Sequence, residues 1–127
     1  MSASNLFAPN VDIVCAGNFL VGSNLTAISA GTASTLTVPQ TVNGIIAFAS
    51  IASPYTLTIP SFVLMSAFFE KYENTSFTFK ISNGSSGTVT VSIPSGYLAI
   101  QTNSIIAAGT VQTFTLTSVG ASIYVTN

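Results

Sequence analysis

Charged side chains are scarce in this sequence: they make up 4% of its 127 residues, against roughly 25% in an average globular protein. The five are Asp12, Glu70, Lys71, Glu73 and Lys80, and the formal net charge is −1. Without a basic patch, the sequence gives no electrostatic reason to bind nucleic acid or an anionic membrane surface. We therefore expect neither partner.

Histidine is absent, and cysteine occurs once, as Cys15. The first absence removes the commonest general base and the commonest metal ligand. A single cysteine cannot form a disulfide or a zinc cluster within one chain, so Cys15 is interpreted as a small core residue, with a bridge between chains as the alternative. Glu70 and Glu73 flank Lys71 and are interpreted as the solvated end of a helix rather than a catalytic pair. The sequence predicts a protein that is not an enzyme and needs no cofactor or metal.

Long hydrophobic runs are also missing. The longest weakly polar stretches, at 44–53 and 59–69, fall well short of the ~18 apolar residues that suggest a membrane span. The first five residues lack the positive start and apolar stretch of a secretory signal. We expect no membrane span, and either a signal that has been removed or a route that needs none.

What the sequence does contain is apolar residues, at 48%, together with 18 serines and 17 threonines. The two kinds alternate with a period of two, which is typical of half-buried strands. The alternating segments are 35–38, 56–59, 76–82, 88–93, 113–117 and 122–126. Turn residues separate them at intervals of about ten residues, as in sandwiches and jelly rolls. The stretch 83–87, Asn-Gly-Ser-Ser-Gly, is interpreted as a hairpin loop.

The alternation also predicts which side chains face the core. Phe77, Phe79, Ile81, Val89, Val91, Phe114 and Leu116 should point inward. Ser76, Thr78, Thr88, Thr90, Thr113 and Thr115 should point away, because successive side chains of a strand lie on opposite faces.

One segment does not alternate. Ser61, directly after Pro60, is a plausible N-cap, and the Leu, Met and Ala residues that follow favour a helix at about residues 61–71. This helix would be apolar nearly all round, so we expect it to be covered on more than one side, as a plug in the sandwich or at an interface. The predicted fold is all-β: a jelly-roll-like antiparallel β-sandwich with one short helix, in a single domain over 1–127. Residues 1–10 are a candidate extended arm.

So few charges would leave a free monomer poorly protected against sticking to its neighbours. We therefore expect the outer threonine and serine faces to pack against copies of the same protein. The residues predicted at subunit interfaces are Phe68, Phe69, Thr90, Thr113 and Thr115.

From about Tyr55 to Thr126 the sequence order is "YTLTIPS", a helix, "TSFTFKISNGSSGTVTVSI", "GYLAI", "SIIAAGTVQTFTLT" and "ASIYVT". This order resembles β-sandwich structural modules of phage and large DNA virus virion surface proteins, such as fibre heads and capsid decoration proteins. The resemblance covers a little over half of the chain and carries no catalytic residues. It implies a homotrimeric structural protein on the virion surface. Its partners would be copies of itself, with other virion proteins as further candidates.

Two other classes of protein stay open. In the first, a subunit of an extracellular cell-surface filament or adhesin, the apolar segment from Val11 to Val21 would add as a strand to the next subunit. The second is a carbohydrate-binding module, in which Tyr55, Tyr72, Tyr97 and Tyr124 would stack on a glycan; core or interface positions are the alternative for these tyrosines.

Overall fold

Strands make up most of the fold. A computed structural model describes residues 24–52, 54–72, 74–100 and 103–127, so residues 1–10, Cys15 and the segment from Val11 to Val21 lie outside the described residues. The described elements, in chain order, are β2 (Asn24–Ile28), β3 (Ala33–Thr35), α1 (Val38–Thr41), β4 (Gly44–Phe48), β5 (Tyr55–Thr58), α2 (Phe62–Phe69), β6 (Ser76–Asn83), β7 (Val89–Ser92), β8 (Leu98–Ile100), β9 (Ile105–Ile106), β10 (Thr110–Val119) and β11 (Ser122–Thr126). The all-β prediction is confirmed.

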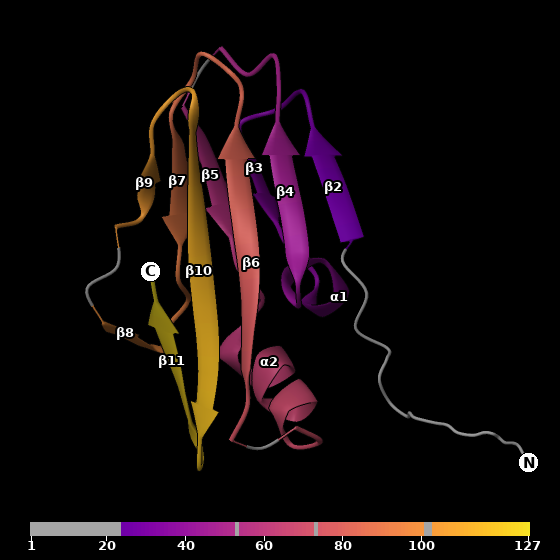
Figure 1. Ribbon diagram of the computed structural model, residues 1–127, viewed down its shortest axis with the longest axis vertical. Coiled ribbons are helices and arrows are strands. Elements are labelled where there is room, and N and C mark those ends of the chain that lie inside the picture. Colours follow the sequence, from indigo (N-terminus) through magenta and orange to yellow (C-terminus); the bar gives the residue numbers. More distant parts are fainter. Residues whose placement is uncertain (1–23, 53, 73, 101–102) are drawn as a thin grey trace, which may run out of the picture.

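The chain passes back and forth between two sheets that lie face to face (Figure 1). The large sheet has the order β2-β4-β6-β10-β11-β8, and the small sheet has the order β3-β5-β7-β9. From β2 to β7, successive strands belong to alternate sheets. Each of the pairs β2/β3, β4/β5 and β6/β7 therefore forms one turn of a wide coil, and the three turns stack side by side.

This winding makes most strand pairs parallel. Five of the eight described pairs are parallel, including β2 with β4, β4 with β6, β3 with β5 and β5 with β7. The two-sheet sandwich is as predicted, but the antiparallel part of the prediction is wrong for these strands, and the jelly roll is not confirmed. The physical reason is that alternation reports which face of a strand is buried, and carries no information on the direction of its partner.

The loop at 83–87 is where the hairpin prediction fails. It joins β6 in the large sheet to β7 in the small sheet, so the two strands are not partners. The Asn83 side chain, 1% exposed, holds this crossing: its Nδ2 donates to the carbonyls of Gly87 (2.8 Å) and Ile106 (3.0 Å). Its Oδ1 accepts from the backbone N–H (3.1 Å) and the hydroxyl (2.6 Å) of Ser85. One buried amide thus replaces the hydrogen bonds that a hairpin ladder would have made.

Replacing Asn83 with leucine tests this role. Leucine has a similar size, but it leaves the Gly87 and Ile106 carbonyls and the Ser85 N–H without their partner. We expect the variant to lose about 3 kcal/mol of unfolding free energy, since each buried unpaired group costs about 1–3 kcal/mol. Ser86→Ala is the control, because Ser86 is exposed and makes only one long contact, 3.4 Å to the Ile51 carbonyl. Urea denaturation that gives equal stabilities for both variants would contradict the assignment.

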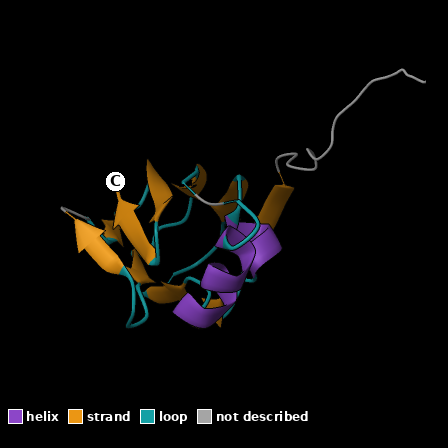
Figure 2. Cartoon of the chain, turned by 90° about the horizontal axis from the view of Figure 1, so that it is seen from below, coloured by secondary structure: helices purple, strands orange, loops and turns teal. Residues whose placement is uncertain are grey.

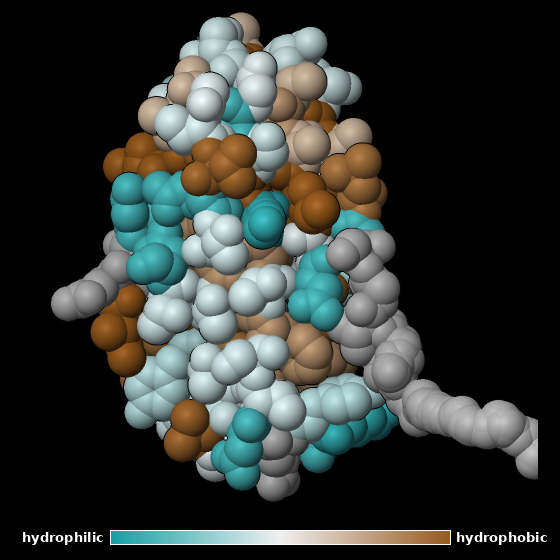
Figure 3. All heavy atoms as spheres, in the orientation of Figure 1, coloured by the Kyte–Doolittle hydropathy of each residue, from teal (hydrophilic) through white to brown (hydrophobic). Residues whose placement is uncertain are grey.

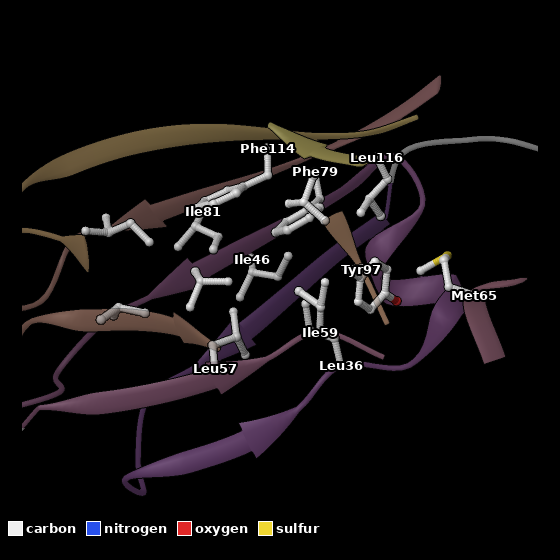
Figure 4. Packing of buried hydrophobic residues seen from close by; sticks show 14 of the residues in the cluster. Leu36, Ile46, Leu57, Ile59, Met65, Phe79, Ile81, Tyr97, Phe114 and Leu116 are labelled. Carbon is white, nitrogen blue, oxygen red and sulfur yellow. The ribbon is translucent and has the colours of Figure 1, made fainter. Parts of the chain in front are cut away.

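The hydrophobic core fills the space between the sheets (Figure 4). Six of the seven side chains predicted to face inward are buried, and the seventh, Phe77, is half-buried and packs against the core. Phe79 and Phe114 stack in its middle, with ring centroids 5.1 Å apart and planes 7° from parallel. The outward prediction is also confirmed: Ser76, Thr78, Thr88, Thr90 and Thr113 are exposed and Thr115 is half-buried.

Helix α2 matches the predicted helix, and Ser61 caps it by accepting a 3.4 Å hydrogen bond from the Leu64 N–H. Met65 and Phe69 turn into the core, whereas Val63 is 76% exposed and Leu64 is also exposed. Within one chain the helix is therefore covered on one side only, and the expectation of fuller cover is wrong at this level. The reason is its position near the lower end of the two sheets in Figure 1, where one side of the helix packs against their core and the other side faces outward.

A second, unpredicted helix, α1, lies beside α2 (Figure 2). Thr37 accepts from the Gln40 N–H (3.3 Å) while the Gln40 side chain accepts from the Thr37 N–H (2.9 Å), which forms a capping box. The chain leaves α1 through a tight turn into β4. A Cβ at Gly44 would stand 1.8 Å from the Gln40 carbonyl oxygen, so only glycine fits there.

Candidate assembly surface

The five residues predicted at subunit interfaces do not lie on one surface. Thr113 and Thr115 are on β10, on the outer face of the large sheet, whereas Thr90 is on β7, on the outer face of the small sheet. Phe69 is 3% exposed and belongs to the core. Phe68 is half-buried in an aromatic group with Phe69, Tyr72 and Phe77. The two sheet faces are therefore separate candidates.

The outer face of the large sheet carries hydroxyl side chains in rows that cross the strands. Strand register places Thr78, Thr115 and Thr126 next to one another on β6, β10 and β11. In the adjoining row, the Ser76 and Thr117 hydroxyls are 2.8 Å apart and share a hydrogen bond. Neighbouring strands are about 4.8 Å apart, so these rows form a regular array of hydroxyl and methyl groups. Such an array can both hydrogen-bond and make apolar contact with a second surface.

Apolar side chains surround this array. Nine large hydrophobic residues are exposed among the described residues, and six of them occupy the outer face of the large sheet. The six are Leu25, Ile45, Leu98, Ile100, Val111 and Val119. In Figure 3 the centre of this face is pale and weakly polar, with both brown hydrophobic and teal hydrophilic residues around it. Exposed apolar groups gathered on one face, rather than scattered singly, are typical of interaction surfaces.

Among the described residues, one charged side chain interrupts the face. Lys80 lies on β6, between Ile45 of β4 and Thr113 of β10 in the strand register. It borders a hollow of about 180 Å³ that Asn43, Gly44, Ile45 and Thr78 also line. A single lysine in so wide a face leaves it close to neutral, as the core of a protein interface usually is.

The outer face of the small sheet is narrower and has no charged residue within its described strands. Its rows are Ala33, Thr56, Thr90 and Ile105, and then Thr35, Thr58 and Ser92. Ile105 is the only large apolar side chain exposed in these rows. The large sheet therefore offers the wider and more apolar of the two surfaces.

The four tyrosines do not form a shared exposed platform. Tyr55 is buried, and its hydroxyl donates to the Ser34 Oγ (2.7 Å). Tyr97 is also buried and donates to the Pro60 carbonyl (2.6 Å), and burial raises the pKa of its phenol. Tyr72 is half-buried against Phe68, and Tyr124 alone is on the outer face of the large sheet. This placement favours core positions over sugar stacking for Tyr55 and Tyr97.

Sequence reasoning found the threonines of this face but missed its apolar residues. Val111 and Val119 lie an even number of residues from Thr113 and Thr115 along β10, so their side chains are on the same face of the strand. Extending the alternation over 111–119 would have placed them outward. Leu25 and Ile45 gave no such signal, because β2 (NLTAI) and β4 (GIIAF) lack the regular alternation of apolar and hydroxyl residues.

Comparisons with protein-family models, with curated proteins and with solved structures found no match for this chain. Neither helix in the described part of the chain has the length and apolar character needed to cross a membrane.

Proposed function

We propose that this protein is a non-catalytic structural subunit that assembles with copies of itself, as a homotrimer on a virion surface, fibre or decoration layer. The observation that carries the proposal is the outer face of the large sheet, whose described strands carry threonine and serine rows, exposed apolar residues and a single charged residue, Lys80. Removing such a surface from water is favourable, because apolar area is buried and almost no charge has to be desolvated. The virion assignment comes from the sequence resemblance.

The edges of both sheets support assembly as well. Among the described strands, β2 and β8 are the outermost of the large sheet, and β3 and β9 are the outermost of the small one. None of these four strands contains a charged residue, although charges are among the usual devices that keep an exposed edge from pairing with another chain.

The edges also favour a second candidate, a subunit of an extracellular filament or adhesin. β2 and β3 lie at the same side of the two sheets (Figure 1), so within the part of the chain that the structure describes the outermost strands of both sheets are next to each other there. A strand from another subunit can extend such an edge through main-chain hydrogen bonds. The segment from Val11 to Val21 is the sequence candidate for that strand.

Electron microscopy of the purified protein separates the two candidates. Pairing through the large sheet in a closed ring stops at a fixed size, so we expect discrete particles with three-fold views. A head-to-tail contact through β2 and β3 does not close and produces fibres that lengthen with concentration. Fibres would contradict the closed trimer and support the filament or adhesin subunit. Dispersed monomers would contradict both candidates.

A further inference from the structure

A pocket of about 310 Å³ lies between α2 and the turn that joins β10 to β11, away from the outer face of the large sheet. Both elements lie toward the lower end of the molecule in Figure 1. The pocket opens to solvent between Glu70, directly after α2, and the turn residues Gly120 and Ala121, because these three lining residues are exposed. Its volume is at the small end of the range that small-molecule sites have.

The floor of the pocket is apolar except for one hydroxyl group. Ser118 of β10 is paired with Ile123 of β11, and both side chains point to the inner side of the large sheet. Phe69 of α2 also lines the floor. Phe69 is 3% exposed, and Ser118 and Ile123 are 2% exposed. This part of the pocket can therefore hold a short apolar group out of water.

The Ser118 hydroxyl is the unusual group at the floor. The Ser118 backbone N–H donates to the Thr75 carbonyl (3.0 Å), but within the described part of the chain the side-chain Oγ has no hydrogen-bond partner. A buried hydroxyl without a partner costs free energy, and few such groups are found in folded proteins. A polar group of a bound ligand would satisfy it. That group should be neutral, because a charge at the floor would be buried away from the exposed Glu70 carboxylate.

The mouth of the pocket favours a positive charge. Glu70 is the one charged residue among the described residues that line it. Helix α2 ends at Phe69, so the partial negative charge of its C-terminus lies beside the same opening. Ser66, half-buried and four residues before Glu70, adds a second hydroxyl to this wall. An ammonium group at the mouth would pair with the carboxylate and keep part of its hydration.

We propose that this pocket binds a small amino alcohol. Its primary ammonium group pairs with Glu70 at the mouth, its apolar stem packs on Phe69 and Ile123, and its hydroxyl exchanges a hydrogen bond with the Ser118 Oγ. An anion would be repelled at the mouth, and a purely apolar molecule would leave the Ser118 hydroxyl unsatisfied. The site does not depend on the proposed self-assembly, because Ser118 and the outward-facing Thr117 lie on opposite faces of the sheet.

An NMR titration of the isotope-labelled protein with aminobutanol tests the site. We expect the backbone amide signals of Ser118, Gly120 and Ala121 to shift, with a dissociation constant of about 1–10 mM, as suits so small a ligand. Butylamine lacks the hydroxyl and should bind about fivefold more weakly. Butanol lacks the ammonium group and should bind about threefold more weakly, because the ion pair is exposed.

Two variants assign the two ends of the ligand. Ser118→Ala should weaken aminobutanol about fivefold and leave butylamine unchanged. This variant should also melt at the same or a higher temperature than the parent, because it removes a buried hydroxyl that has no partner. Glu70→Gln should weaken both amines about threefold and leave butanol unchanged. Lys71→Gln is the control, because Lys71 is exposed next to Glu70 and is not among the residues that line the pocket.

Three results would overturn the proposal. The first is that aminobutanol does not shift the amide signals around the pocket. The second is that butylamine or butanol binds as tightly as aminobutanol. The third is that Ser118→Ala or Glu70→Gln binds aminobutanol as tightly as Lys71→Gln does. The mass of the protein in solution, which reports self-assembly, is measured separately, so failure of this site leaves the proposed function untouched.

Discussion

A Thr113→Lys variant should fail to assemble while folding normally. Thr113 is exposed on the outer face of the large sheet, next to Lys80 in the strand register. In the assembled state a second lysine there would be buried without a partner and beside a like charge, which costs several kcal/mol. We expect the dissociation constant to rise by more than a hundredfold, with the melting temperature of the monomer close to that of the parent. Light scattering and thermal unfolding of the same sample measure the two quantities.

Two further variants locate the interface. Thr32→Lys makes the same substitution at an exposed bend outside both sheets, and it should assemble like the parent. Thr90→Lys places the lysine on the outer face of the small sheet, and it reports whether that face is covered too. Thr115→Lys should behave like Thr113→Lys, although Thr115 is half-buried in the monomer and its variant needs the folding control most. If Thr113→Lys and Thr115→Lys both assemble normally, the outer face of the large sheet is solvated.

A Phe69→Ser variant should be severely destabilised. The Phe69 ring is 3% exposed, and its centroid is 5.6 Å from that of Phe68 and 5.8 Å from that of Phe77. The substitution removes buried apolar area, leaves a cavity at the end of the sandwich and inserts a hydroxyl there, so we expect a loss of about 3–5 kcal/mol. Phe68→Ser should cost less, because Phe68 is only half-buried.

Val63→Ser is the matched control for Phe69→Ser, since it puts the same residue on the exposed side of α2. We expect its unfolding free energy to lie within about 0.5 kcal/mol of the parent value. Denaturant unfolding under conditions where the protein is monomeric separates folding from assembly. Equal stabilities for Phe69→Ser and Val63→Ser would mean that α2 is not anchored through Phe69.

The strands could be predicted from the sequence because apolar and hydroxyl residues alternate so regularly. That pattern located β6, β7 and β11 to within one residue at each end and found the middle of β10, and Ser61 marked the start of α2. The sheet topology could not be predicted in the same way. The residues 83–87 have the composition of a hairpin loop, yet a buried Asn83 side chain carries the chain across to the other sheet. A local pattern cannot show that a polar side chain will find a carbonyl 23 residues away.

Helix α1 has a capping signal in its sequence, but the same residues also fit the alternation of a strand. Thr35 to Val38 reads as a short strand ended by Pro39, but Thr37 with Gln40 three residues later is a capping box, and Pro39 suits the first turn of a helix. For the assembly surface, the sequence predicted that Thr113 and Thr115 face outward. It did not predict that Lys80 lies next to Ile45. That neighbour depends on the parallel pairing of β4 with β6, which follows from the coil.

The mass of the wild-type protein in solution tests self-assembly most directly. Size-exclusion chromatography with light scattering at micromolar concentration should return a mass of about 39 kDa, three times the 13.0 kDa mass of the chain. On dilution, this mass should fall only when the protein concentration drops below the dissociation constant. A mass of 13.0 kDa at every concentration would mean that the hydroxyl rows and exposed apolar residues of the large sheet face water, and would contradict the account.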